Sequence, residues 1–196
     1  MSSIKITWEL FQKPYEIIKL YEFLSDKNIK TVLEIGTFHG GTALVWAHLV
    51  DPSDGLVYSL DNLDPKPKMV YRKHPLKNRI VEIRGDSHSD ETKNYVKSIL
   101  GPSKVDFLFI DGDHTYQGVK DDFFGYAKLV KDGCWIAFHD ILDTPFHRNI
   151  PPPIGPCLVS LLWSEIKDKY KSIEILDPDD SSMMGIGVLQ WDAAAL

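Results

Sequence analysis

The strongest constraint on the fold is an alternation of short apolar runs with helical stretches along most of the chain. Nearly continuous apolar strands separated by helices are typical of a parallel sheet covered on both faces, so we expect an α/β fold. The expected strands cover residues 31–35, 56–60, 79–83, 105–110 and 134–138. The expected helices cover residues 14–26, 41–49, 89–100, 116–130 and 158–170.

The last two expected strands, residues 171–176 and 185–191, have no helical stretch between them. A short connection joins antiparallel neighbours, because a parallel pair needs a crossover of about a dozen residues. These strands therefore predict an antiparallel pair on an otherwise parallel sheet. We expect one domain over residues 1–196, with an N-terminal helical segment at 1–28. Two long loops, 62–78 and 141–156, are candidate lids over a substrate.

Composition excludes several classes of partner. The chain has 28 Asp and Glu residues against 22 Lys and Arg residues, a formal net charge of -6. Nucleic acids and anionic membranes require a basic surface, so neither is an expected partner. No apolar run approaches the roughly 18 residues of a membrane span. The two cysteines, Cys134 and Cys157, fit neither a disulfide framework nor a paired metal motif, and we expect a cytoplasmic protein.

A glycine-containing turn follows the first expected strand, in the run Val32-Leu-Glu-Ile-Gly-Thr-Phe-His-Gly-Gly-Thr42. The run does not match the dinucleotide fingerprint G-x-G-x-x-G, because Phe38 occupies the second glycine position and hinders close approach to a pyrophosphate. Three glycines still allow the chain to fold tightly under a ligand. Glu34 is a carboxylate in an apolar strand and needs a polar partner.

Polar residues also follow the other expected parallel strands. Asp61 ends the second strand, where a carboxylate can accept hydrogen bonds from both hydroxyls of a ribose. The run Asp86-Ser-His88 follows the third strand and also suits a helix N-terminal cap. The largest group follows the fourth and fifth strands and comprises Asp111, Asp113, His114, His139 and Asp140. Carboxylate and imidazole groups together suit a divalent metal, a general base, or both.

These motifs resemble the class I S-adenosylmethionine-dependent methyltransferases, and specifically the small-molecule O-methyltransferases that include catechol-type, macrolide-sugar and cephalosporin-biosynthesis relatives. The resemblance covers residues 31–191, and its most specific part is IDGDHTYQGVKDDF followed by AFHD. It implies a seven-stranded sheet in the order 3-2-1-4-5-7-6, with strand 7 antiparallel and helices on both faces. It also implies S-adenosylmethionine as cofactor and a small-molecule acceptor that the sequence does not identify. A homodimer is compatible with the sequence.

The resemblance assigns the cofactor's parts to these motifs. The turn from Glu34 to Gly41 would hold the methionine end, Asp61 would bind the ribose, and residues 86–88 would lie near the adenine. The full set of expected cofactor residues is Glu34, Gly36, Thr37, His39, Gly40, Gly41, Asp61, Asn62, Asp86, Ser87, His88 and Asp111.

The resemblance also raises the question of a metal such as Mg²⁺ or Mn²⁺. Metal-dependent members of the group take ligands after strand 4 and strand 5, which correspond here to Asp111, His139 and Asp140. The imidazole of His139 departs from the group's usual oxygen ligands and suits Mg²⁺ poorly. Three interpretations stay open: His139 binds a softer ion, it acts as a base or orienting group, or no metal binds. The catalytic candidates are His114 as general base, Asp111 and His139.

Other functions compete with methyl transfer. A metal-dependent hydrolase would use the Asp111, Asp113, His114, His139 and Asp140 cluster without a nucleoside cofactor. A nicotinamide oxidoreductase shares the sheet and the ribose-binding acid, but the glycine turn does not fit it. A non-catalytic module would keep the fold and bind the cofactor without turnover. We predict transfer of a methyl group to a hydroxyl of a small molecule or sugar.

Overall fold

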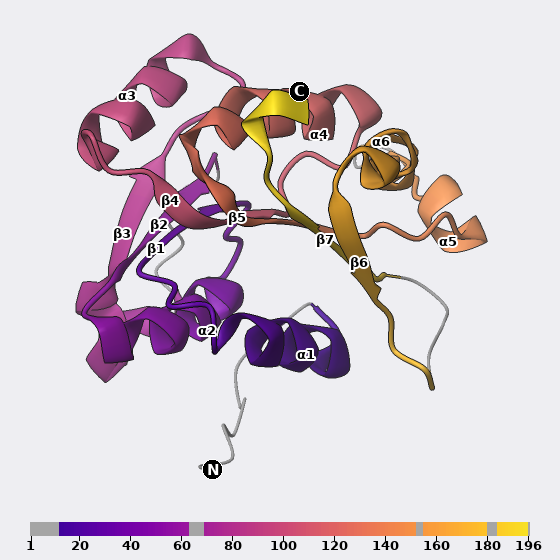
Figure 1. Ribbon diagram of the computed structural model, residues 1–196. Helices are drawn as coiled ribbons and strands as arrows, with labels where there is room; N and C mark the ends of the chain where they lie inside the picture. The colour runs from indigo at the N-terminus through magenta and orange to yellow at the C-terminus, as the bar shows by residue number, and fades with distance from the viewer. Residues whose placement is uncertain (1–11, 63–68, 152–154, 180–183, 196) are drawn as a thin grey trace.

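The computed structural model describes residues 12–62, 69–151, 155–179 and 184–195, which form a seven-stranded sheet between two layers of helices (Figure 1). The strand order is β3-β2-β1-β4-β5-β7-β6, and β7 runs antiparallel to both of its neighbours. This confirms the predicted α/β class, the strand order and the direction of the seventh strand. The strands are β1 (Thr31–Ile35), β2 (Leu56–Asp61), β3 (Ile80–Arg84), β4 (Val105–Ile110), β5 (Val130–His139), β6 (Lys171–Ile175) and β7 (Ile186–Gln190).

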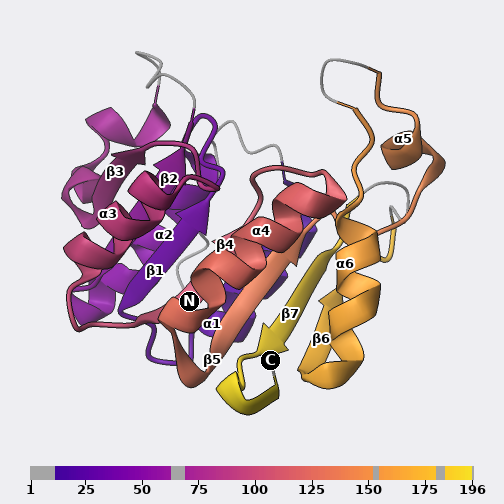
Figure 2. The same cartoon turned by 90° about the horizontal axis from the view of Figure 1, so that it is seen from above.

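The helices cover both faces of the sheet, as predicted. They are α1 (Pro14–Leu24), α2 (Gly41–Val50), α3 (Asp90–Leu100), α4 (Tyr116–Tyr126), α5 (Pro145–Arg148) and α6 (Val159–Ile166). Helices α1 and α2 lie on one face, whereas α3, α4 and α6 lie on the other (Figure 1). Seen from above, α4 runs along β4 and β5, and α6 lies beside β6 (Figure 2).

Each face of the sheet has its own apolar core, because successive side chains of a strand point to opposite faces. In β4, Leu108 and Ile110 pack into the core under α3, α4 and α6. Phe107 and Phe109 pack into the core under α1 and α2. All six residues of β4 are buried, which explains why this strand is so apolar in sequence.

Several predicted boundaries are wrong, and the helix expected over residues 158–170 ends as an α-helix at Ile166. The helix expected over residues 116–130 ends as an α-helix at Tyr126 and continues only as a short 3-10 turn, Ala127–Leu129. Strand β5 then begins at Val130 rather than at residue 134, because its first residues pair with β4 through an irregular register between Val105 and Phe107. The polar run from Lys131 to Gly133 is exposed, so its sequence resembles a loop.

The two predicted long loops contain short helices in their described parts, while residues 63–68 and 152–154 lie outside the described residues. The first loop packs onto the glycine turn, since Val70 N donates to His39 O (3.1 Å) and the Tyr71 ring is buried there. A lid role for either loop, the single-domain assignment, the homodimer and the cytoplasmic location stay predictions. Within the described ranges, no helix has the length and apolar character needed to cross a membrane.

Candidate active site

A cavity of about 840 Å³ lies at the carboxyl ends of the parallel strands, where open α/β sheets bind their ligands. The glycine turn after β1 and the loops after β2 and β3 line one end. The groups that follow β4 and β5 line the other end. Ten of the twelve expected cofactor residues line this cavity, namely Gly36, Thr37, His39, Gly41, Asp61, Asn62, Asp86, Ser87, His88 and Asp111.

The glycine turn folds tightly and is held by a carboxylate from the next strand. Gly36 has φ +89°, and a Cβ atom there would lie only 1.9 Å from the carbonyl oxygen of Asp111. Phe38 has φ +49°, a left-handed conformation that is uncommon for a large side chain. Asp61 Oδ2 accepts hydrogen bonds from the backbone N–H groups of Thr37 (2.8 Å) and Phe38 (2.7 Å). Asp61 therefore shapes the turn that the resemblance assigns to the cofactor.

Glu34 lies beneath this turn and does not line the cavity, and neither does Gly40. The Glu34 side chain is fully buried and accepts hydrogen bonds from Trp46 Nε1 (3.1 Å) and Ser59 Oγ (2.7 Å). Burial raises the pKa of Glu34 to about 7, even though these hydrogen bonds lower it. The polar partner that this carboxylate needed is thus a buried network under the turn.

The loop after β3 is fixed by hydrogen bonds of its own. Asp86 Oδ1 accepts from His88 N (2.9 Å), and the carbonyl of Ser87 accepts from Tyr126 OH (2.9 Å). Behind the loop, Asp122 of α4 is fully buried, with Oδ1 3.3 Å from His88 Nε2. Burial raises the pKa of Asp122 to about 6. Sequence reasoning missed Asp122 because an acid within a helix resembles a solvated one.

The other end of the cavity is a cluster of carboxylates and imidazoles. Asp111 Oδ1 lies 3.2 Å from His114 Nε2 and 3.3 Å from His139 Nδ1. Its second oxygen, Oδ2, accepts a hydrogen bond from Gln12 Nε2 (2.6 Å), which sequence reasoning did not identify. His114 is about one-third exposed, whereas His139 is only 5% exposed. His114 is therefore the imidazole of this pair that a substrate in the cavity can reach.

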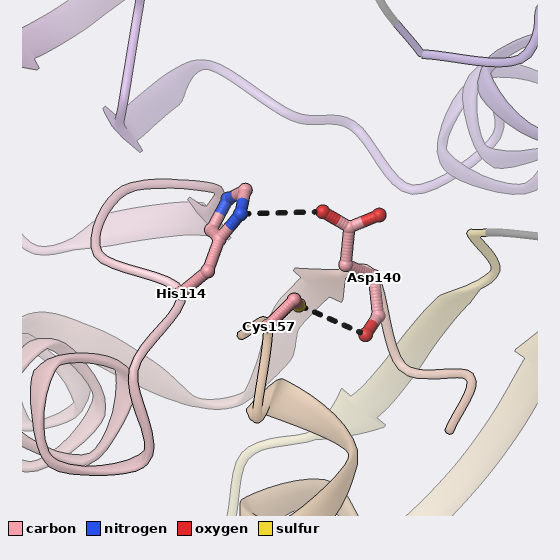
Figure 3. A group of neighbouring side chains, drawn as sticks. All are labelled: His114, Asp140 and Cys157. Atoms are coloured by element: carbon pink, nitrogen blue, oxygen red, sulfur yellow. Dashed lines mark hydrogen bonds and ion pairs between the residues drawn. The ribbon is translucent and has the colours of Figure 1, made fainter. Parts of the chain in front are cut away.

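Asp140 connects this cluster to a second layer of side chains. Its backbone has φ +61°, which is uncommon for a non-glycine residue and marks functional sites. Oδ2 lies 3.5 Å from His114 Nδ1, and Oδ1 lies 3.3 Å from His139 Nδ1. Oδ1 also lies 3.5 Å from Nε2 of His147, a buried residue of α5. Cys157 Sγ donates a weak hydrogen bond to the Asp140 carbonyl oxygen at 3.9 Å (Figure 3).

The charges of this cluster depend on one another. Burial opposes ionisation, but the positive charge of His139 and the hydrogen bond from His114 lower the pKa of Asp111 to about 2. The charge of His139 likewise outweighs burial and holds the pKa of Asp140 well below its usual range. Conversely, both carboxylates outweigh burial and raise the pKa of His139 well above its ordinary value. The pKa of His114 is also raised, through its hydrogen bond to Asp111.

The donor set fits a divalent metal ion. One atom each of Asp111, His139 and Asp140 can be chosen so that all three lie within 4.8 Å of one another. His139 Nε2 and Asp140 Oδ1 are buried and have no hydrogen-bond partner among the described residues. This carboxylate oxygen faces His139 Nδ1 at 3.3 Å and His147 Nε2 at 3.5 Å without a hydrogen bond, so it has spare capacity to coordinate an ion. Because the set mixes imidazole nitrogen with carboxylate oxygen, it suits Mn²⁺ or a softer ion better than Mg²⁺.

Residues 33–141, more than half of this 196-residue chain, match a family model described as a methyltransferase domain. The chain belongs to this methyltransferase family. The resemblance to class I S-adenosylmethionine-dependent methyltransferases and the predicted enzyme class are thereby confirmed. The hydrolase, the nicotinamide oxidoreductase and the non-catalytic module are set aside as the function of this methyltransferase.

Three known proteins show how the methyltransferase compares with others. An uncharacterized protein of Acanthamoeba polyphaga mimivirus is 28% identical over 158 residues, which is 77% of this chain and 69% of that protein. A Staphylococcus aureus protein assigned as a caffeoyl-CoA O-methyltransferase has a TM-score of 0.69 at 18% identity, over 92% of this chain and 85% of that one. MycE of the mycinamycin biosynthetic pathway, solved with Mg, S-adenosylhomocysteine and mycinamycin VI, has a TM-score of 0.59 at 20% identity.

The match to MycE covers 89% of the methyltransferase but 48% of MycE, so this chain spans about half the length of that enzyme. At such identities the two structural matches establish a shared fold.

Proposed function

We propose that this methyltransferase transfers the methyl group of S-adenosylmethionine to a hydroxyl of a small molecule or sugar, with His114 accepting the hydroxyl proton. The observation that carries the proposal is the position of His114. Its ring is partly exposed at the cavity wall, and its two nitrogens face Asp111 at 3.2 Å and Asp140 at 3.5 Å. A base placed in this way can reach a hydroxyl in the cavity while two carboxylates fix its orientation.

The cofactor end of the cavity supports the same proposal. S-adenosylmethionine supplies an activated methyl group on a positively charged sulfur. Five carboxylates line the cavity, from Asp61, Asp86, Asp111, Asp113 and Asp140. Such a lining attracts a cation and repels the phosphates of a dinucleotide. Part of the acidity behind the net charge of -6 is therefore concentrated in the lining of one cavity.

Turnover requires the acceptor oxygen, the methyl carbon and the sulfur to lie in line. In this proposal the Asp61-supported turn positions the cofactor, and Asp111 and Asp140 orient the ring of His114. The proton moves from the acceptor hydroxyl to a ring nitrogen of His114, which must be neutral to receive it. His139 is buried between the two carboxylates and positions them.

The proposal includes a role for a divalent metal ion. A divalent ion held by Asp111, His139 and Asp140 would supply positive charge that acidifies the acceptor hydroxyl and lowers the pKa of His114. Removal of the ion would leave the raised pKa of His114 in place, and a larger fraction of the base would then be protonated at neutral pH. Mn²⁺ is the better trial ion, because one of the ligands is an imidazole.

Calorimetry with S-adenosylhomocysteine tests the cofactor assignment. The protein is stripped of metals with a chelator and titrated first alone, then with Mg²⁺ and with Mn²⁺. We expect binding in all three conditions, and no heat in any of them would overturn the assignment. Transfer of a labelled methyl group to a panel of phenols and sugars then tests the acceptor class, with mass spectrometry locating the methyl group. A product methylated on nitrogen or carbon alone would contradict O-methylation.

A further inference from the structure

A second group of potential metal ligands lies beside the one described above and contains the thiol of Cys157 (Figure 3). One ligand atom each of His114, Asp140 and Cys157 can be chosen so that the three lie within 4.8 Å of one another. His114 comes from the loop after β4, Asp140 from the end of β5, and Cys157 from the segment before α6. Imidazole, carboxylate and thiolate are together a donor set that binds Zn²⁺ and Co²⁺ and disfavours Mg²⁺.

Backbone hydrogen bonds hold these three residues in place. Leu158 N donates to the carbonyl of His114 at 2.7 Å, and Cys157 N donates to the carbonyl of His147 at 2.9 Å. The segment that carries Cys157 is therefore hydrogen-bonded to the backbone of His114. A site of this kind loses little conformational entropy when a ligand binds, because its side chains come from segments that are already ordered.

The two histidines face different oxygens of Asp140. Oδ1 lies 3.3 Å from His139 Nδ1, whereas Oδ2 lies 3.5 Å from His114 Nδ1. Cys157 falls within 4.8 Å of ligand atoms of His114 and Asp140, and its Sγ lies 3.9 Å from the backbone carbonyl oxygen of Asp140. The first group therefore offers only nitrogen and oxygen, and the second adds sulfur. This difference allows the two groups to be distinguished by spectroscopy.

We propose that His114, Asp140 and Cys157 form a three-ligand site for a thiophilic divalent cation such as Zn²⁺ or Co²⁺. The metal–sulfur bond forms as the thiol loses its proton to solvent, and no electrons are exchanged. The fourth coordination position is left for water, because His114 and Asp140 both line the cavity. A cation there engages His114 and prevents it from acting as a base. That inhibitory consequence rests on the proposed function, whereas binding of the cation does not.

Cobalt spectroscopy of the 196-residue chain tests the site. The metal-free protein is kept reduced with a phosphine and titrated with Co²⁺. We expect a strong near-ultraviolet band from thiolate-to-cobalt charge transfer, together with the visible bands of a four-coordinate ion, and Zn²⁺ should erase both. Absence of the near-ultraviolet band at saturating Co²⁺ would overturn the proposal.

Four variants locate the band. Cys157→Ser should abolish it, whereas Cys134→Ser, which changes the other of the two cysteines, should retain it. His114→Ala should weaken Co²⁺ binding by roughly 10–100-fold or more, and this variant keeps the thiol in place if Cys157→Ser fails to fold. Asp111→Ala removes a ligand of the nitrogen and oxygen group and a hydrogen bond to His114, but no ligand of the thiol-containing group, so the band should persist. A band that survives in Cys157→Ser, or binding that is unchanged in His114→Ala, contradicts the site.

The activity assay is read separately from the spectrum. If Zn²⁺ inhibits methyl transfer and a chelator restores it, with the same midpoint as the loss of the cobalt band, the thiol-containing site controls His114. If the band appears but transfer is unaffected by Zn²⁺, the site stands and the assignment of His114 as base is wrong.

Discussion

The two ends of the cavity use carboxylates in different ways. At the glycine turn, Asp61 accepts hydrogen bonds from two backbone N–H groups, and Glu34 is buried under the turn among neutral donors. At the other end, Asp111 and Asp140 face the imidazoles of His114 and His139. The first arrangement fixes the shape of the backbone. The second sets the charge of side chains, which is what proton transfer requires.

This contrast predicts which measurements each end controls. Changes at the turn should alter stability and cofactor affinity together, because the same atoms shape both. Changes at the imidazole end should alter turnover and leave cofactor affinity nearly intact. The four predictions below test this division, beginning with the largest expected effect.

The largest effect should come from His114→Ala. Loss of the general base should lower kcat roughly 10²–10⁴-fold, while the Kd for S-adenosylhomocysteine stays within about twofold. Steady-state kinetics and calorimetry measure the two quantities on the same preparation. His48→Ala is the matched control, since His48 lies on α2 and does not line the cavity, and its kcat should be unchanged. Unchanged turnover in His114→Ala, or loss of cofactor binding, would contradict the division between the two ends.

The next effect concerns the glycine turn. Gly36→Ala should destabilise the fold by about 4 kcal/mol, because a positive φ and a clash with the Asp111 carbonyl add together. Gly133→Ala is the control: its φ is also positive, at +78°, but no atom lies within 4 Å of the added Cβ. It should cost only about 1 kcal/mol. Urea unfolding measures both, and equal costs would show that close packing of the turn against β4 contributes nothing.

Glu34 predicts a pH dependence of stability. Its folded pKa of about 7 lies above the ordinary value of 4.5, so the stabilising effect of the bound proton is complete below pH 4.5 and is lost as the pH rises through 7. Glu34→Gln stays neutral at every pH. Relative to this variant, the wild type should lose about 3 kcal/mol of unfolding free energy between pH 4.5 and pH 8. Urea titrations at several pH values measure the difference, and parallel curves would show that Glu34 is charged in the fold.

Asp61 should give the smallest change in stability. Asp61→Ala removes the acceptor of two backbone N–H groups and should cost about 2 kcal/mol. Asp61→Asn keeps one acceptor oxygen and should cost less than half of that. If Asp61→Asn folds normally but binds S-adenosylhomocysteine at least tenfold more weakly, the carboxylate also contacts the cofactor directly. Equal affinity in Asp61→Asn and the wild type would limit Asp61 to support of the turn.

Most of the fold could be predicted because its signals are local. The apolar runs from Val105 to Ile110 and from Val32 to Ile35 are buried on both faces, which is why their sequences lack alternation. Helix α3 begins where the side chain of Ser89 accepts a hydrogen bond from Thr92 N, which is the usual role of a serine at a helix N-terminus. The exposed start of β5 was missed, because a strand whose side chains face solvent has no apolar pattern to reveal it.

The site residues that stand at or just after a strand end could be predicted from the sequence, whereas those on other segments were missed. Asp61, Asp111 and Asp140 stand directly after or at the end of parallel strands, so the topology brings them to one crevice. Gln12 and Cys157 reach the same place from segments with no motif of their own. Gln12 lies 99 positions from Asp111 along the chain, and a local sequence pattern cannot predict a contact between residues so far apart.

The sequence by itself determined the class of fold, the residues at the strand ends and the acidic character of the crevice. Each follows from local pattern and from the rule that parallel strands end at a common edge. The tertiary structure decided which side chains lie close enough to change one another's pKa or to bind the same metal ion. Burial raises the pKa of Glu34 to about 7, whereas the charge of His139 and the hydrogen bond from His114 outweigh burial and lower the pKa of Asp111 to about 2, although both side chains are carboxylic acids. Packing also decided that Cys157 meets His114 and Asp140, because contacts between distant segments depend on how the elements assemble.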